Sequence, residues 1–293
     1  MLRMTVFKRS LQHLLHAIGL YHRLKASRLY DAYWMLANRD IIAARSAEVA
    51  FYRQLLGDFH PGGVIFDIGA NQGHKTDVFL RLGARVVAAD PDEYNQEVLR
   101  QRFLGLRVRK KPVVIVGKAV SDVDAITTLW VEFPGSGKNT LSHKWVNVLR
   151  EDDRRFGVQL HFATQRRVQT ISLESLIVAH GTPAFIKIDV EGHELQVLRG
   201  LRRPIPCLSF EVNLPEFRCE GQACIQYLTD LAPGGKFNYA VDCRRGLVFE
   251  KWLDAPEIVG TLDACAEPSI EVFWKTREGR ARWGGDTLRP EGH

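Results

Sequence analysis

Short apolar runs alternate with stretches of helical spacing along the middle of the chain, and this alternation predicts an α/β fold. Residues 64–66 and 84–89 are apolar almost throughout, as expected for buried strands of a parallel sheet. Between them, Val78, Phe79 and Leu82 would share one face of a helix. Strand, helix and strand in this order predict a βαβ unit.

The same pattern continues toward residue 275 and predicts the rest of the sheet. We expect a helix over 94–103, a third strand with its following turn over 112–120, an additional strand over 125–133, a fourth strand over 185–189 and a fifth over 208–212. Ser172 is placed to cap a helix before the fourth strand, and Leu195, Leu198 and Leu201 repeat at helical spacing after it. Two late β-prone runs, 237–243 and 270–275, would close the sheet as a hairpin.

Turns and changes in composition divide the chain. A helical stretch over 41–56 leads to the turn Pro61-Gly62-Gly63, so we expect an N-terminal helical extension over 1–60 and a sheet domain over 61–276. A loop beginning at Pro134 opens an insert, 134–170, whose dense charge and weak periodicity predict a surface cap that selects the substrate. Residues 277–293 are rich in Arg and Gly and are expected to form a loose tail.

Positive charge is concentrated at the two ends of the chain. The net charge is +6, and residues 1–60 carry nine Lys and Arg against four Asp and Glu, which leaves the body almost neutral. A nucleic-acid enzyme would carry a basic stripe beside its site, so we expect no nucleic-acid partner. Residues 7–18 predict a basic amphipathic helix, which would suit an anionic membrane surface. Its apolar face could instead pack on the protein's own core or on a second copy in a homo-oligomer.

The cysteines fit a reducing compartment. All five lack a C-x-x-C partner and their number is odd, which disfavours both a zinc site and a disulfide framework. No apolar run approaches the roughly 20 residues that a membrane span needs. We therefore expect a cytoplasmic protein. Any contact with a membrane surface would be peripheral and would be made through residues 1–30.

The turn after the first strand carries the most informative chemistry. Asp67 ends the strand, and Gly69, Asn71 and Gly73 can adopt the left-handed backbone that brings the main chain close to a ligand. The middle glycine of a dinucleotide fingerprint is missing, and the acid suits an ammonium or sulfonium better than a pyrophosphate. Asp90 ends the second strand, where a carboxylate can accept hydrogen bonds from both ribose hydroxyls. The alternative is a tight turn between two solvated acids.

Two motifs carry a family resemblance: Asp67-Ile68-Gly69-Ala70-Asn71-Gln72-Gly73 and Phe185-Ile186-Lys187-Ile188-Asp189-Val190-Glu191-Gly192-His193-Glu194. Together they resemble the FkbM family of S-adenosylmethionine-dependent methyltransferases. The resemblance implies a Rossmann-like class I methyltransferase fold, with a seven-stranded, mostly parallel sheet and an antiparallel last strand. It also implies S-adenosyl-L-methionine as cofactor. The residues expected at the cofactor are Asp67, Gly69, Ala70, Asn71, Gly73, Asp90, Pro91, Ala119, Val120 and Asp189.

The resemblance further implies O-methylation, commonly of a hydroxyl on a sugar, glycan or secondary metabolite. An alcohol is a poor nucleophile until its proton is leaving, so a base within reach should assist. The candidate catalytic residues are Glu191, His193 and Glu211, at or just beyond strand ends. Each has a structural alternative, because Glu191 could stabilise a helix dipole, His193 could pack against a helix cap and Glu211 could pair with a basic side chain.

Three further questions stay open on the sequence. Asp189, Glu211 and Asn213 offer the oxygen ligands that Mg²⁺ prefers, but the chain lacks a paired Asp-Asn after the fifth strand, so we expect no metal. A scaffold or partner protein of a glycan-building complex, which binds the cofactor without turnover, is an alternative function. Protein or nucleic-acid methylation is another, although the chain has neither an Asn-Pro-Pro-aromatic motif nor a basic body.

Overall fold

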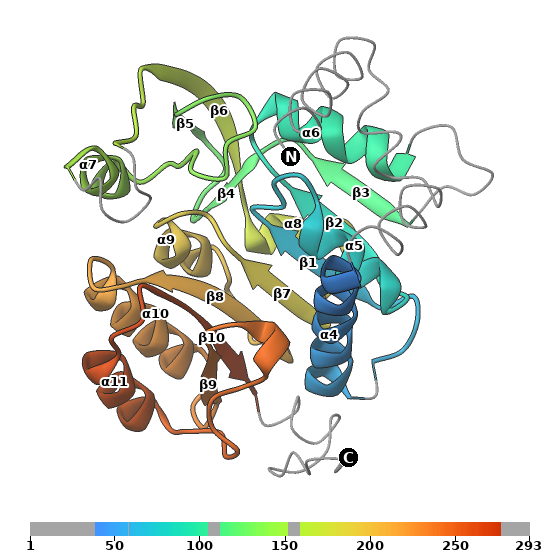
Figure 1. Cartoon of the computed structure of the whole chain (residues 1–293), viewed down its shortest axis with the longest axis vertical. Helices are drawn as coiled ribbons and strands as arrows, with labels where there is room; N and C mark the ends of the chain where they lie inside the picture. Colours follow the sequence, from blue (N-terminus) through green and yellow to red (C-terminus); the bar gives the residue numbers. More distant parts are fainter. Residues whose placement is uncertain (1–38, 58, 105–111, 152–158, 277–293) are drawn as a thin grey trace, which may run out of the picture.

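The computed structural model describes residues 39–57, 59–104, 112–151 and 159–276. Its main feature is a seven-stranded sheet with the strand order β3-β2-β1-β7-β8-β10-β9 (Figure 1). The strands are β1 (Val64–Ile68), β2 (Arg85–Ala89), β3 (Val113–Val116), β7 (Phe185–Ile188), β8 (Cys207–Asn213), β9 (Lys236–Ala240) and β10 (Ser269–Lys275). The central strands are buried on both faces, which explains their continuously apolar runs.

The direction of the strands confirms the predicted fold class. The neighbours β3, β2, β1, β7 and β8 run parallel, whereas β10 runs antiparallel to both β8 and β9. The register aligns Ile68 of β1 with Ala89 of β2 and with Ile188 of β7, so these three strands end at one edge. The order of strands reverses between β1 and β7, and doubly wound sheets bind their ligands beside such a point.

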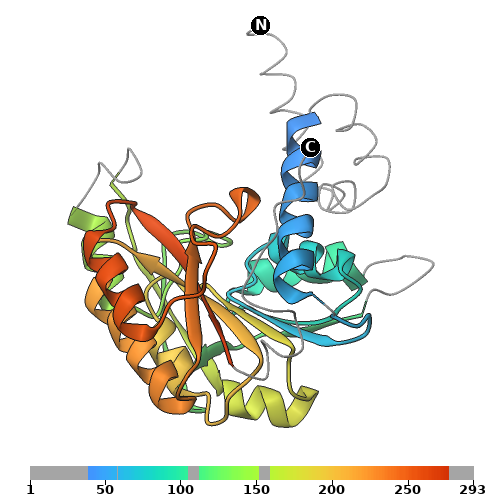
Figure 2. The same cartoon turned by 90° about the horizontal axis from the view of Figure 1, so that it is seen from below.

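Helices cover both faces of the sheet (Figures 1 and 2). One face carries α4 (Arg39–Leu56), α5 (His74–Arg81) and α6 (Glu93–Leu99), and the other carries α8 (Leu173–His180), α9 (Glu194–Arg199), α10 (Arg218–Leu231) and α11 (Ala255–Ala264). Side chains of a strand point alternately to the two faces, so Ile65 joins the first core and Phe66 the second. The turn at the end of β1 therefore projects from a strand that is fixed on both sides.

The predicted elements are largely confirmed, with helices where the spacing predicted them at α4, α5, α6, α8 and α9. Ser172 caps α8 by accepting a hydrogen bond from the amide of Ser175, as predicted. The two late runs form β9 and β10, which pair antiparallel and close the sheet as predicted, and residues 241–268, which include α11, join them. Helices α10 and α11 were not predicted.

A second, three-stranded sheet was also unexpected. It contains β4 (Ala119–Ser121), β5 (Ile126–Val131) and β6 (Thr164–Ser172) in the order β4-β6-β5. The predicted third strand is thus divided, because β3 ends at Val116 and the chain then leaves the main sheet to pair with β6.

The insert over 134–170 is more than a surface cap. Its helix α7 (His143–Glu151) buries Trp145, Val146 and Leu149 in the same core as α8 to α11. The expectation of a surface cap is therefore wrong for α7. The apolar residues of this helix span little more than one turn, and charged residues precede and follow them in the sequence. The helical periodicity was therefore hard to recognise.

Some predictions fall outside the described residues. These are the helix over 7–18, with the membrane contact inferred for residues 1–30, and the tail over 277–293. In the part of the chain that the structure describes, no helix combines the length and the apolar character needed to cross a membrane.

Candidate functional site

The turn after β1 brings the backbones of three strands together. Gly69 has a φ of 78°, and a Cβ at this position would lie 1.7 Å from the carbonyl oxygen of Asp189. The amides of Gly69 and Ala70 both donate to the carbonyl of Ala89, at 3.0 Å each. Asn71 follows with a φ of 46°, in the left-handed region that Asn tolerates. Only glycine allows β1, β2 and β7 to end this close together.

Asp90 ties the glycine turn to the end of β2. Its Oδ2 accepts from the amide of Asn71 at 2.8 Å, and its Oδ1 accepts from the amide of Asp92 at 2.9 Å and from the side chain of Asn95 at 3.2 Å. Burial raises the pKa of Asp90 to about 6, although these donors oppose the shift. The carboxylate therefore lies at the strand end that was predicted to bind a ribose, and it also holds the turn in place.

Asp67 lies deeper than its neighbours. Its side chain is fully buried, Thr76 donates to its Oδ2 at 2.5 Å, and among the described residues its Oδ1 has no hydrogen-bond partner. Burial raises the pKa of Asp67, an effect that the nearby Lys187 ammonium only partly offsets. A buried oxygen without a partner is costly, so this atom marks a place where a bound donor would be favourable.

A cleft, here called the first cleft, opens above the ends of β1, β2 and β7. Its lining residues are Gly69, Asn71, Ala89, Asp90, Pro91, Ala119, Val120, Leu129, Ser136, Gly137, Asn139, Thr140, Leu141, Asp189, Val190 and Glu191. Seven of the ten residues that the sequence assigned to the cofactor are among them, whereas Asp67, Ala70 and Gly73 are buried and absent from the lining. The loop at the start of the insert, residues 136–141, supplies the outer wall.

Asp189 and Glu191 follow β7, and each contacts a lysine. The Nζ of Lys187 donates to Asp189 at 2.6 Å. Burial alone would raise the pKa of Asp189, but this ammonium holds it below its usual value. Glu191 has an unusual φ of 55° and accepts from Lys138 at 2.8 Å and from the indole of Trp145 at 2.9 Å. Burial still raises the pKa of Glu191, against the opposing effect of Lys138.

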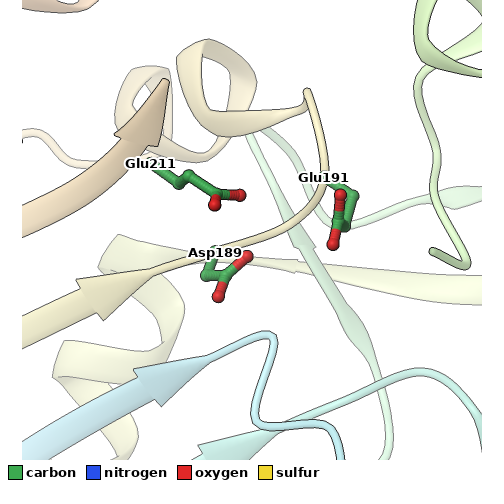
Figure 3. Close-up of side chains that lie close together, drawn as sticks. All are labelled: Asp189, Glu191 and Glu211. Carbon is green, nitrogen blue, oxygen red and sulfur yellow. The ribbon is translucent and has the colours of Figure 1, made fainter. Parts of the chain in front are cut away.

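Glu211, on β8, faces the same space as these two acids (Figure 3). Ser269 donates to its Oε1 at 2.8 Å and Asn213 to its Oε2 at 3.2 Å. Burial, together with the charges of Asp189 and Glu191, raises the pKa of Glu211 well above its usual value. At neutral pH this carboxyl holds a proton more readily than an ordinary glutamate does.

The three carboxylates also bear on the question of a metal. One oxygen from each of Asp189, Glu191 and Glu211 lies within 4.8 Å of the others, a grouping that could hold a cation. However, ammonium groups already neutralise Asp189 and Glu191, and Glu211 has two donors of its own. The expectation of a site without metal stays a prediction.

Glu211 and Asp189 also line another cleft, here called the second cleft. Its wall comes from α4, α5, the ends of β7 and β8, the segment 241–244 and the start of β10. Asp189 lines both clefts, so the two meet at this residue.

His193 takes another direction. Its Nε2 lies 3.0 Å from the hydroxyl of Ser121, and it is absent from the walls of both clefts. Burial lowers the pKa of His193 to about 4, so the ring is uncharged at neutral pH. Its catalytic role stays a prediction, but the geometry favours the alternative of a packed side chain beside the helix cap.

Several important residues were missed. Lys138, Trp145 and Lys187 hold the acids in place, and Glu194 accepts from the amides of Val190 and Gly192, at 3.1 Å each. Burial raises the pKa of Glu194 to about 8. Lys187 had a signal, because a lysine inside the apolar run 185–188 must find a buried acid. Lys138 and Trp145 had no such signal, because their partner Glu191 lies 53 and 46 positions away in the sequence.

Solved structures with overall likeness to this chain include several methyltransferases, all at low identity and with TM-scores below 0.5. A TehB-like S-adenosylmethionine-dependent methyltransferase from Corynebacterium glutamicum shares 9% identity at a TM-score of 0.41, covering 86% of this chain and 100% of that chain. The plantazolicin methyltransferase BpumL, solved with S-adenosylhomocysteine, shares 12% at 0.39, covering 87% and 94%. Precorrin-6y C5,15-methyltransferase from Geobacter metallireducens shares 10% at 0.38, covering 79% and 88%.

The sequence comparisons are more decisive. No curated protein matches the chain. The model of the methyltransferase FkbM domain matches residues 67–232, from Asp67 near the end of β1 to the residue after α10. This span exceeds half of the 293 residues and contains both motifs, the insert, β2 and β7. The chain therefore belongs to the FkbM methyltransferase family.

Proposed function

We propose that this methyltransferase transfers the methyl group of S-adenosylmethionine, the cofactor of its family, to a hydroxyl oxygen of a sugar, glycan or secondary metabolite. The observation that carries the proposal is the meeting of two clefts at Asp189, beside a glutamate whose pKa is strongly raised. One cleft can hold the methyl donor and the other the acceptor, with a proton acceptor between them.

The first cleft has the chemical features that the cofactor needs. Val120 and Leu129 offer apolar surface for a base, and Asp90 stands at the strand end where a ribose is bound in doubly wound folds. The carboxylate of Asp189 can receive an ammonium group. Gly69, which has no side chain to keep the backbone of Asp189 away, contributes only main-chain atoms to the wall of this cleft.

The residues of the chain then have two tasks. The bound cofactor supplies a methyl group on a positively charged sulfur. The protein has to align the acceptor oxygen with it and to remove the proton of the hydroxyl. Glu211 is the best placed base, because it lines the second cleft and its carboxylate is oriented by Ser269 and Asn213. Both oxygens of Glu191 are engaged by Lys138 and Trp145, so its task is to hold the insert over the first cleft.

We further infer a cytoplasmic location. All five cysteines are free, and three of them (Cys207, Cys224 and Cys243) are buried. Buried thiols without disulfide partners are typical of proteins from a reducing compartment. The acceptor partner, a homo-oligomer and a peripheral membrane contact stay predictions.

Isothermal titration with S-adenosylhomocysteine tests the cofactor site. We expect micromolar binding by the wild type and its loss in Asp90→Ala. Gly137→Trp gives a second test, because a Cβ at Gly137 meets nothing closer than the side chain of Asn71, at 3.5 Å. A large ring there should fill the first cleft without disturbing the fold. Gly260→Trp, at an exposed site in α11 with open space around it, is the matched control.

Each result has a clear meaning. Weakening by more than about tenfold in Gly137→Trp, with unchanged binding in Gly260→Trp, supports the assignment of the first cleft. If titration of the wild-type protein with S-adenosylhomocysteine gives no heat of binding, the proposal is wrong. Tight binding without methyl transfer to any hydroxyl compound would favour a scaffold that binds the cofactor without turnover.

A further inference from the structure

The second cleft is built mostly from parts of the chain outside the matched family domain. Glu48 comes from α4, Asp242 and Arg244 from the segment before and within the short 3-10 helix η2 (Cys243–Arg245), and Glu271 from β10. All four lie outside residues 67–232. The loop at the start of the insert, in contrast, lines the first cleft.

Charges of both signs line this cleft, and they are paired. Lys75 forms ion pairs with Glu48 and, at 3.8 Å, with Glu271. Lys187 pairs with Asp189 at 2.6 Å, and Arg244 with Asp242 at 2.6 Å. Even when Glu211 is protonated, the wall carries more carboxylates than cations. An anionic ligand would meet a net negative surface here, at a cost that grows as water is excluded.

Hydroxyl groups suit such a wall better than an anionic group does. A hydroxyl donates one hydrogen bond and accepts others, so it can bridge a carboxylate and a neighbouring ammonium without a charge of its own. Glu271 shows this pattern within the protein, because the hydroxyls of Ser209 and Tyr52 donate to its Oε1 at 2.6 and 3.2 Å. A neutral ring that carries several hydroxyls would extend the same arrangement into the cleft.

We propose that the second cleft is the acceptor site, that it takes a neutral, hydroxyl-rich group such as a sugar ring, and that residues outside the matched domain determine this choice. The proposal rests on the proposed function, since it assigns the acceptor of the same reaction. It replaces the expectation that the insert selects the substrate. Glu211 and Asp189 would then face the reacting hydroxyl, and the wall from η2 and α4 would hold the rest of the ring.

Arg244 is the residue at which specificity can be tested. Its guanidinium donates three hydrogen bonds to Asp242, from Nε to Oδ1 and Oδ2 at 2.8 and 2.9 Å and from Nη2 to Oδ2 at 2.6 Å, and its side chain is 52% exposed. It can thus donate further hydrogen bonds to a ligand while its position is fixed. Arg245 follows in the same short helix and is exposed, but it is absent from the wall of the cleft.

The experiment measures transfer of a tritium-labelled methyl group by the full-length protein at saturating S-adenosylmethionine. The acceptors are the methyl α-glycosides of glucose, mannose, galactose and rhamnose, compared with glucuronate and glucose 6-phosphate. We expect transfer to at least one neutral glycoside and at least tenfold lower kcat/KM for the two anions. Arg244→Ala should raise KM for the glycoside about tenfold, the effect of one lost charge-assisted hydrogen bond, with kcat nearly unchanged. Arg245→Ala should match the wild type.

Binding of S-adenosylhomocysteine separates the two levels of the argument. If the wild type and both variants bind it equally, a failure with the glycosides concerns the acceptor site alone. Preference for the anionic sugars, no transfer to any glycoside, or an unchanged KM in Arg244→Ala would each overturn the proposal. A wild type that does not bind S-adenosylhomocysteine would overturn the proposed function as well.

Discussion

At the scale of single residues, the site depends on the unequal environments of three neighbouring acids. Asp189 has the ammonium of Lys187 at 2.6 Å and keeps a lowered pKa. Glu191 is held by Lys138 and Trp145, whereas Glu211 accepts from the neutral side chains of Ser269 and Asn213 and has a pKa raised well above the usual value. Groups of one chemical type whose pKa values diverge in this way can take different roles in one reaction. Asp189 suits a permanent charge, and Glu211 suits proton transfer.

The first prediction concerns Glu211 and pH. A base must be deprotonated to act, so kcat for the glycoside should rise with pH until the raised pKa of Glu211 is passed, and then level off. Glu211→Gln should lower kcat by roughly 10²–10⁴ and remove this rise, with unchanged binding of S-adenosylhomocysteine. Glu250→Gln, at an exposed position, is the control. The same pH profile in Glu211→Gln and wild type would exclude Glu211 as the base.

Site residues could be predicted from the sequence where neighbouring positions already indicated their role. Gly69 and Asp90 stand directly after apolar strands, and the turn chemistry alone indicated their places. Glu194, in contrast, hydrogen bonds to amides two and four residues before it, in a turn whose shape depends on the left-handed backbone of Glu191 and Gly192. Nothing in the spacing of the acids revealed that geometry.

At the scale of elements, the insert and the β7–α9 turn act as one unit. The hydroxyl of Thr140 donates to the carbonyl of Glu191 at 2.7 Å, and Lys138 and Trp145 reach the side chain of the same residue. These contacts join the outer wall of the first cleft to its floor. The insert is therefore part of the cofactor site as well as part of the core.

The second prediction compares two buried tryptophans. Trp145→Phe removes the N–H that donates to Glu191, and it should lower the free energy of unfolding by about 1–3 kcal/mol more than Trp274→Phe does. Trp274 is the matched control, because it is equally buried and its Nε1 has no hydrogen-bond partner among the described residues. Urea unfolding measures both variants. Equal losses would mean that the bond to Glu191 contributes nothing to stability.

Elements with a cap or a long apolar run were predictable, and those without were not. Helix α8 could be predicted because the side chain of Ser172 caps its first turn. Helix α10 buries few large apolar residues, and Gly221 and Cys224 help to form its inward face. Its core position follows from close packing against Val212, since a Cβ at Gly221 would lie 2.9 Å from that side chain. Such close packing is tertiary and leaves no periodic signal.

At the scale of the whole molecule, α4 packs against the sheet domain as part of its core. Tyr52 and Leu56 of this helix are fully buried, and the ring of Tyr52 contacts those of Phe79 and Phe185 at centroid distances of 5.1 and 5.6 Å. Glu48 of the same helix lines the second cleft. The predicted start of the domain at residue 61 therefore leaves out a helix that packs into the core.

The third prediction follows from this packing. A chain that starts at residue 39 keeps all of these contacts, so this chain and the full-length protein should both unfold cooperatively. A chain that starts at residue 61 exposes Phe79 and Phe185 and should lack a cooperative thermal transition, because each large core side chain contributes about 3–5 kcal/mol. Circular dichroism during heating measures this. Two truncated chains of equal stability would show that α4 is dispensable.

The position of β10 determines when the sheet can be completed during synthesis. Strand β9 leaves the ribosome before β10, yet in the described sheet β9 pairs only with β10. A nascent chain that has reached residue 268 can therefore form the five parallel strands β3, β2, β1, β7 and β8, but the edge of β8 stays open. Until residues 269–275 emerge, that edge can pair with strands of other chains, and it is where a chaperone would give the most protection.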